Sequence, residues 1–306
     1  MIRSLSVFII ISALLGTLSG CSSNEEKMAK TSEQAIYEKA MDSLNRSNYS
    51  MAVEYLQALE EHYPFGPYAE HAQLELIYAY YRIREYESVI ASADRFIRLH
   101  PQHRNVDYAY YMRGIASFHN DSALFSVLPT DITRRDPGTA REAFGHFAQL
   151  LNRYPESKYA LDAQRRMIFL RNMLARYEIH VANYYFKRGA YLAAANRGKY
   201  VVENFQGTPA VPDGLAVMAQ AYHLMKLEEL SKDAIEVLAS NFPDHPALDG
   251  KGGFDHQFMN LDGRSWVSYL TLGLFDKDQT IAYDTREIYD PFYGNKKDAL
   301  PPPKSN

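Results

Sequence analysis

The chain has 306 residues, enough for one long domain or two modest ones, and its 46% hydrophobic and 23% charged residues are typical of a globular protein. A formal net charge of -4 excludes a general nucleic-acid-binding protein, because phosphate contacts require a strong excess of Lys and Arg. The single cysteine, Cys21, excludes an intramolecular disulfide and a cysteine-based zinc site.

The N-terminus has the features of an export signal. Arg3 precedes an apolar stretch of about 14 residues, Leu5–Leu18, which is short for a membrane span and typical of a signal-peptide core. The sequence Leu-Ser-Gly-Cys that ends at Cys21 resembles the bacterial lipobox, in which the cysteine thiol receives a diacylglycerol before cleavage. We therefore expect a signal peptide over residues 1–20 and a lipid on Cys21. The alternative is an ordinary signal peptide followed by a chance cysteine.

A lipid on Cys21 would anchor the protein outside the cytoplasm, since several acyl chains hold a protein stably on a bilayer. Ser22 follows at the position where an aspartate would resemble an inner-membrane retention signal, so we expect the periplasmic face of the outer membrane. Residues 21–32 are polar and without apolar periodicity, and we expect a lipidated tether there. No cofactor is expected besides the covalent lipid.

Residues 33–246 carry helical apolar periodicity interrupted by short Pro or Gly turns, and strand-like alternation is absent, so the sequence predicts an all-α fold. Similar sequences recur at the ends of helix pairs, with steps of 37, 54, 51 and 37 residues: Tyr63-Pro64, His100-Pro101, Tyr154-Pro155, Phe205-Gln206 and Phe242-Pro243. The tetratricopeptide repeat is a 34-residue pair of antiparallel helices. We therefore predict a tetratricopeptide-repeat α-solenoid of about five helix pairs, with insertions in the two longer steps.

Positions inside the repeats agree with this register. Small residues that allow close helix crossing stand at Ala40, Gly114, Ala182 and Ala219, and tyrosines open second helices at Tyr49, Tyr86 and Tyr191. The insertions are predicted as a loop over residues 119–136 and an added helix over residues 158–174. Residues 247–306 contain several glycines and end near Pro301-Pro302-Pro303, so we expect a partly disordered C-terminal extension.

Chemistry-bearing motifs are weak. His100 and His103 flank Pro101 at the end of a repeat, and we interpret them as loop residues rather than metal ligands. The sequence contains no glycine-rich phosphate loop, Gly-x-Ser-x-Gly or Walker motif. We therefore predict no catalytic residues, no metal site and no enzyme, and a hydrolase without a sequence signature stays as the third hypothesis.

Binding features are better supported. The sequence Tyr-Pro-Phe-Gly-Pro-Tyr over residues 63–68 joins two repeats, and Phe65 and Tyr68 offer apolar rings. Arg95 and Arg98 follow in the second helix of the next repeat, and arginine suits a carboxylate. These four residues predict a pocket for an aromatic or extended peptide. The alternative is a rigid inter-repeat turn with Phe65 fixed inside it.

Strings from the lipobox to about residue 245 resemble the BamD family, the lipoprotein subunits of the outer-membrane β-barrel assembly machine. They include Tyr63-Pro-Phe-Gly-Pro-Tyr68, Leu76-Ile-Tyr-Ala-Tyr-Tyr81, Asp94-Arg-Phe-Ile-Arg-Leu99, Tyr111-Met-Arg-Gly114, Asp121-Ser-Ala-Leu124, Arg135-Asp-Pro137, Arg188-Gly-Ala190 and Asn196-Arg197. The resemblance implies a scaffold that helps insert β-barrel proteins into the outer membrane. Residues beyond about 245 depart from the shorter family members.

The resemblance also implies partners. The N-terminal repeats would meet unfolded outer-membrane β-barrel proteins, and the C-terminal repeats would contact the barrel subunit BamA, alongside the other lipoproteins of the machine. Tyr184, Arg188 and Arg197 are the partner-binding residues that we expect, and Arg197 is favoured because arginine is rarely buried unpaired. The alternative function is a periplasmic repeat adaptor for cell-wall or secretion machinery, with the same fold and other partners.

Overall fold

The computed structural model describes residues 31–120, 132–134, 136–249, 253–256 and 282–289. Every regular element in these ranges is a helix, and an isolated antiparallel bridge joins Leu248 to Phe254. The all-α prediction is confirmed. The chain divides into an N-terminal unit, residues 1–126 with 145–164, and a C-terminal unit, residues 127–144 with 165–306. None of the helices within the described ranges is both long and apolar enough to span a bilayer.

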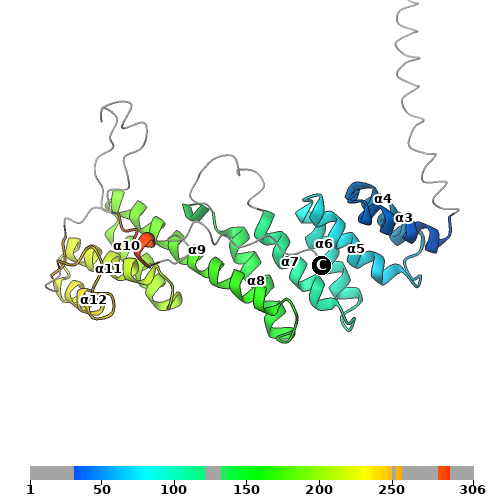
Figure 1. Cartoon of the computed structure of the whole chain (residues 1–306). Coiled ribbons are helices and arrows are strands. Elements are labelled where there is room, and N and C mark those ends of the chain that lie inside the picture. The colour runs from blue at the N-terminus through cyan, green and yellow to red at the C-terminus, as the bar shows by residue number, and fades with distance from the viewer. Residues whose placement is uncertain (1–30, 121–131, 135, 250–252, 257–281, 290–306) are drawn as a thin grey trace, which may run out of the picture. The chain divides into compact units, whose positions relative to one another are not determined.

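The N-terminal unit is built of helices that pack on their neighbours in chain order (Figure 1). These are α3 (Glu33–Asn45), α4 (Tyr49–His62), α5 (Ala69–Arg82), α6 (Tyr86–Leu99) and α7 (Val106–Asn120), followed by α8 (Gly138–Arg153), whose last residues belong to this unit. Pairs α3–α4 and α5–α6 are the first two repeats, and α7 opens the third. Tyr49 and Tyr86 start second helices, as predicted.

Local sequence explains where these helices begin and end. The side chains of Ser32 and Asn48 accept hydrogen bonds from the backbone N–H groups of Ala35 and Met51, and so cap the first turns of α3 and α4. The turn inside each of the first two repeats contains a residue with positive φ, Ser47 or Arg84, which reverses the chain after the first helix.

Small residues permit close crossing at the predicted positions. A Cβ added to Gly114 would lie 2.6 Å from a ring carbon of Phe147, so α7 and α8 pack with no room for a side chain there. Ala40, Ala182 and Ala219 are all fully buried. The predicted crossing residues are therefore confirmed in both units.

The C-terminal unit contains most of α9 (Ala160–Lys187), followed by α10 (Tyr191–Asn204), α11 (Val211–Leu224) and α12 (Glu228–Asn241). Tyr191 opens α10, as predicted. The prediction of a separate helix over residues 158–174 is wrong in one respect, because that helix continues without a break to Lys187. No Gly or Pro lies within this stretch, so nothing interrupts the helix. The described helices thus form five pairs, α3–α4 to α11–α12.

The two predicted irregular regions are only partly described. Residues 132–134 form a short 3₁₀ helix, η2 (Ile132–Arg134), and α7 extends to Asn120, whereas residues 121–131 and 135 of the predicted loop lie outside the described residues. In the C-terminal extension, residues 257–281 and 290–306 also lie outside them. Residues 282–285, followed by the short helix α14 (Arg286–Tyr289), belong to the C-terminal unit and bury Tyr283 in its core.

A buried charge network holds this unit together. Arg176 of α9 forms an ion pair with Asp213 of α11, and both side chains are buried. His245 Nε2 lies 3.3 Å from Asp213 Oδ1, and the Thr285 backbone N–H donates to Asp213 Oδ2 at 2.9 Å. Burial alone would raise the pKa of Asp213, but Arg176, His245 and the Thr285 N–H together lower it to about 2. Asp213 is therefore ionised in the folded protein.

Replacing this carboxylate should destabilise the protein in a pH-dependent way. At neutral pH, Asp213→Asn should cost about 3–5 kcal/mol of unfolding free energy, since it leaves a buried guanidinium without its main partner. The pKa of Asp213 in the folded protein, about 2, lies below its ordinary value of 3.8. The difference in unfolding free energy between wild type and Asp213→Asn should therefore be at its full size above about pH 5. It should shrink by about 2 kcal/mol as the pH falls toward 2.

Urea denaturation of both proteins across this pH range measures the difference directly, and charges common to the two cancel. Asp233→Asn, at an exposed position of α12, is the matched control and should change stability by less than about 0.5 kcal/mol. An advantage of the wild type that is constant from neutral to acid pH would contradict the assignment.

Candidate functional site

The turn between α4 and α5 presents one aromatic side chain and uses two others for anchoring. The Tyr63 hydroxyl donates to the Thr31 carbonyl at 2.9 Å, and the Tyr68 ring stacks on Tyr37 with centroids 4.7 Å apart. Phe65 lies between these anchors and is 98% exposed. The alternative that Phe65 is fixed inside the junction is therefore wrong. An exposed phenylalanine on a rigid turn is a surface feature that a partner can bury.

The two arginines of the predicted peptide pocket lie on α6, and both are exposed. Arg95 Nη1 pairs with Glu60 Oε1 at 3.0 Å, and Arg95 lines a cavity of about 230 Å³ between α4, α5 and α6. Neither Phe65 nor Tyr68 lines this cavity. The structure thus places the predicted residues in one unit, with the rings at a turn and Arg95 at a polar cavity.

Two glutamines of this cavity were missed in the sequence. The Gln57 amide donates to the Tyr80 hydroxyl at 2.7 Å. Gln73 is buried, and its Oε1 has no hydrogen-bond partner among the described residues. With Glu60 beside them, these groups suit a ligand that offers N–H donors, such as a peptide backbone. A polar Gln73 within the apolar stripe of α5 was the signal available in the sequence.

The histidine-containing turn after α6 brings two imidazole rings close to one carboxylate. His100 Nδ1 and His103 Nε2 lie 3.2 and 3.6 Å from the two carboxylate oxygens of Glu70. Burial, more than the neighbouring charges, lowers the pKa of His103. Within the described part of the chain, no group of three or more His, Cys, Asp or Glu side chains is arranged to hold a metal ion.

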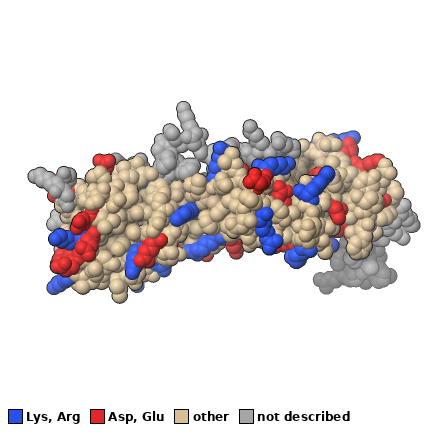
Figure 2. Space-filling model, turned by 90° about the horizontal axis from the view of Figure 1, so that it is seen from below, with Lys and Arg blue, Asp and Glu red and all other residues tan. Residues whose placement is uncertain are grey.

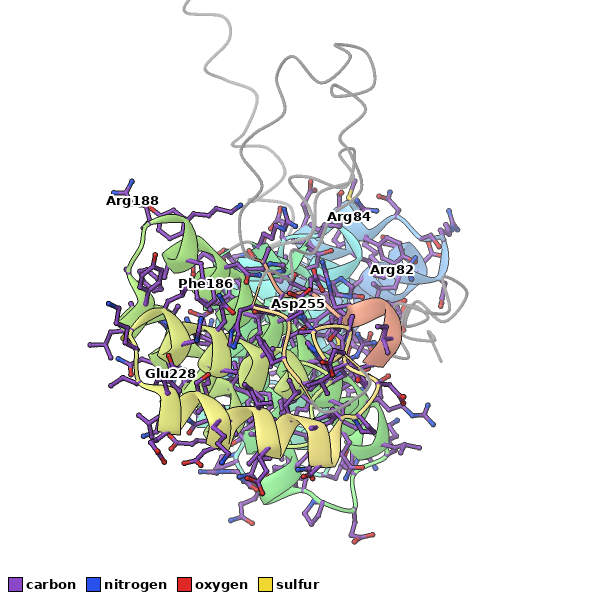
Figure 3. All side chains as sticks on the ribbon, turned by 90° about the vertical axis from the view of Figure 1, so that its left-hand side faces the viewer. Arg82, Arg84, Phe186, Arg188, Glu228 and Asp255 are labelled. Atoms are coloured by element: carbon purple, nitrogen blue, oxygen red, sulfur yellow. The ribbon has the colours of Figure 1, made fainter. Side chains whose placement is uncertain are left out.

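The predicted partner-binding residues lie on α9 and α10 and after the end of α9. Tyr184 is 56% exposed, and Arg188 projects from the surface while Phe186 lies inside the unit (Figure 3). Arg197 makes an internal contact, in which its Nη1 donates to Glu178 Oε2 at 2.7 Å. Glu178 is only 3% exposed. The hydrogen bond to Glu178 raises the pKa of Arg197, so this guanidinium neutralises a buried acid as well as facing solvent.

A second cavity, of about 360 Å³, lies beside Tyr184 in the C-terminal unit. It is lined by Arg134, Tyr177, His180, Val181, Asn183, Tyr184, Lys187, Ala282 and Asp284. His180 Nε2 lies 2.8 Å from Thr133 Oγ1. Of these residues only Tyr184 could be predicted from the sequence, because residues separated by up to 150 positions meet here. The cavity combines the rings of Tyr177 and Tyr184 with the cations Arg134 and Lys187 and the carboxylate of Asp284, so it offers both apolar and charged contacts to a bound segment.

Charge on the surface is mixed. Lys, Arg, Asp and Glu side chains are interspersed over the face in Figure 2, in keeping with the net charge of -4. The described residues of this face therefore present no extended field of one sign.

Comparison with known proteins places the chain in a family. A family model described as YfiO, outer membrane lipoprotein, matches residues 29–238. A protein of Neisseria gonorrhoeae named outer membrane protein assembly factor BamD is 41% identical over 248 residues, which cover 78% of this chain and 93% of that protein. Proteins of the same name from Xylella fastidiosa and Vibrio cholerae are 37% and 38% identical, over 79% and 72% of this chain and 85% and 91% of their own lengths.

Among solved structures, a tetratricopeptide repeat protein from Parabacteroides merdae aligns with a TM-score of 0.34 and 15% identity, over 69% of this chain and 67% of that one. The family assignment depends on the sequence matches, which extend over most of this chain and most of each relative. The chain belongs to the BamD family of outer membrane lipoproteins.

Proposed function

We propose that this protein is an outer membrane protein assembly factor that acts as a scaffold and catalyses no reaction. The observation that carries the proposal is the match to proteins named assembly factor BamD over almost their whole length, 93% and 91% for two of them. The helix pairs supply rigid surfaces for other chains, which is the usual use of repeat proteins. The alternative, a periplasmic adaptor for cell-wall or secretion machinery, has no support among these relatives.

The partner that we propose for the C-terminal unit is a BamA-type barrel subunit, bound through Tyr184, Arg188 and Arg197. Copurification from detergent-solubilised membranes should recover a large β-barrel protein with this chain, whereas recovery of cell-wall enzymes instead would favour the adaptor. Tyr184→Ala should weaken that binding without a stability change above about 0.5 kcal/mol, because the ring is exposed.

Arg197 requires a paired design, since its contact with Glu178 makes single substitutions ambiguous. Arg197→Gln should lower stability, because among the described residues it leaves the buried Glu178 carboxylate with only Arg141 at 3.7 Å. It should also lower partner affinity, because it removes a proposed partner-binding cation. Adding Glu178→Gln should restore most of the stability. We expect the double variant to bind the barrel subunit at least about tenfold more weakly than wild type. Wild-type affinity in a stable double variant would assign Arg197 a purely internal role.

The N-terminal unit is proposed to meet unfolded β-barrel proteins through Phe65, Tyr68, Arg95 and Arg98. Because Phe65 is exposed, Phe65→Ala should leave thermal stability within about 0.5 kcal/mol of wild type and reduce substrate binding. A photocrosslinker at position 65 or 98 should label a peptide from the end of a barrel protein. A crosslinker at position 46, on the exposed Arg46 after α3, is the control. Equal labelling from all three positions, or none from 65 and 98 in the folded protein, contradicts the proposal.

Membrane attachment is proposed to occur through a lipid on Cys21, which lies outside the described residues. The support is the lipobox-like sequence at the end of the N-terminal apolar stretch, together with membership of a lipoprotein family. Mass spectrometry of the mature N-terminus should find acyl chains on Cys21, and Cys21→Ala should remain uncleaved or mislocalised. The neighbouring Ser22→Ala should be processed normally. An unmodified N-terminus that begins elsewhere would refute the anchor.

A further inference from the structure

Residues 282–285 of the C-terminal extension, here called the strap, lie against the C-terminal unit as a bound peptide would. The Asn183 amide donates to the Tyr283 carbonyl and accepts from the Tyr283 N–H, both at 2.9 Å. Asp213 accepts from the Thr285 N–H at 2.9 Å. Side chains of α9 and α11 thus form hydrogen bonds with the strap backbone at two alternate residues, Tyr283 and Thr285. This is how grooves hold extended peptides, with backbone contacts for affinity and side-chain pockets for specificity.

The groove also contacts the side chains of the strap. Tyr283 is fully buried, and its ring centroid lies 6.2 Å from that of Phe186 and 6.5 Å from those of His245 and Phe254. The next residue, Asp284, places a carboxylate oxygen 3.4 Å from the Arg176 guanidinium. The pattern that this groove accepts is therefore an aromatic residue followed directly by an acidic one.

The groove keeps its charges paired when the strap is removed. Arg176 retains its buried partner Asp213, which also keeps His245, and Asp284 carries its own partner, Arg286, at 2.6 Å. Release of the strap would therefore leave none of these charges without a partner. A buried charge left unpaired would strongly oppose release. The 360 Å³ cavity, lined by Asn183 and Ala282 among others, extends the groove at one end of the strap and leaves room for a longer ligand.

We propose that this groove of α9 and α11 is a binding site for an extended peptide with an aromatic–acidic pair, and that the strap occupies it in cis as a displaceable ligand. The 25 residues 257–281 connect the strap to the rest of the unit. A ligand on the same chain binds intramolecularly, so its effective concentration does not depend on the protein concentration. A partner segment must therefore outcompete the strap, so the site responds to partners that present the pair in a favourable form.

Weakening the strap in the full-length chain tests the proposal. The probe is a labelled, end-capped peptide of residues 282–289, followed by fluorescence anisotropy. It should bind the Tyr283→Ala protein at least about tenfold more tightly than the wild type, because the cis competitor is weakened. Ile288→Ala, at a 55% exposed position of the same segment, is the matched control and should resemble wild type. Adding Asn183→Ala to Tyr283→Ala, or replacing the tyrosine or the aspartate in the peptide, should abolish the gain.

Equal peptide binding by the Tyr283→Ala and wild-type proteins, with helical content intact, would overturn the proposal. If Tyr283→Ala fails to fold, a protease site inserted after Gly263 of the wild-type chain alters none of the groove and strap residues named above. After cleavage, the free C-terminal fragment should exchange with the labelled peptide and elute separately under native conditions. A fragment that stays bound and never exchanges would show that the strap is a permanent part of the core, and would equally overturn the proposal.

Discussion

The ion pair between Arg176 and Asp213 is the interaction on which the C-terminal unit depends. It joins α9 to α11, and the same carboxylate accepts from His245 and from the backbone of Thr285, so two helices and the C-terminal extension meet at one buried charge. A buried pair of this kind contributes little net stability over an apolar core, but removing one member is costly. The ion pair therefore fixes how α9 packs against α11, and it provides the Asp213 carboxylate to which the Thr285 backbone N–H donates.

Contacts inside each unit fix the helices and turns that carry the exposed side chains. Glu178 lies two residues after Arg176 on α9, and its contact with Arg197 joins α9 to α10, while Tyr184 of α9 is exposed. In the N-terminal unit, Tyr68 is fixed by stacking on Tyr37 while Phe65 projects. In both units an internal contact fixes the same helix or turn that carries an exposed side chain, which gives a scaffold a preorganised surface for binding other chains.

The helix pairs could be predicted because their signals are local. The apolar period, the prolines after four of the five pairs and the tyrosines that open second helices each depend on neighbours within a few residues. The continuous α9 also had a local signal, the absence of Gly and Pro from Ala160 to Lys187, which the repeat spacing obscured. The strap had none. Asn183 and Tyr283 lie 100 positions apart, and no composition or period in a glycine-containing extension indicates that its tyrosine is buried in the core.

The central claim is that a non-catalytic scaffold promotes the assembly of β-barrel proteins in the outer membrane. Its most direct test is the folding of an outer-membrane β-barrel protein in liposomes that contain the barrel subunit, with and without this chain, followed by the gel-mobility shift of the folded barrel. The account predicts that the folded yield rises only when both proteins are present, and that Tyr184→Ala reduces the rise. A yield that is unchanged by this chain, although it remains bound to the barrel subunit, would contradict the account.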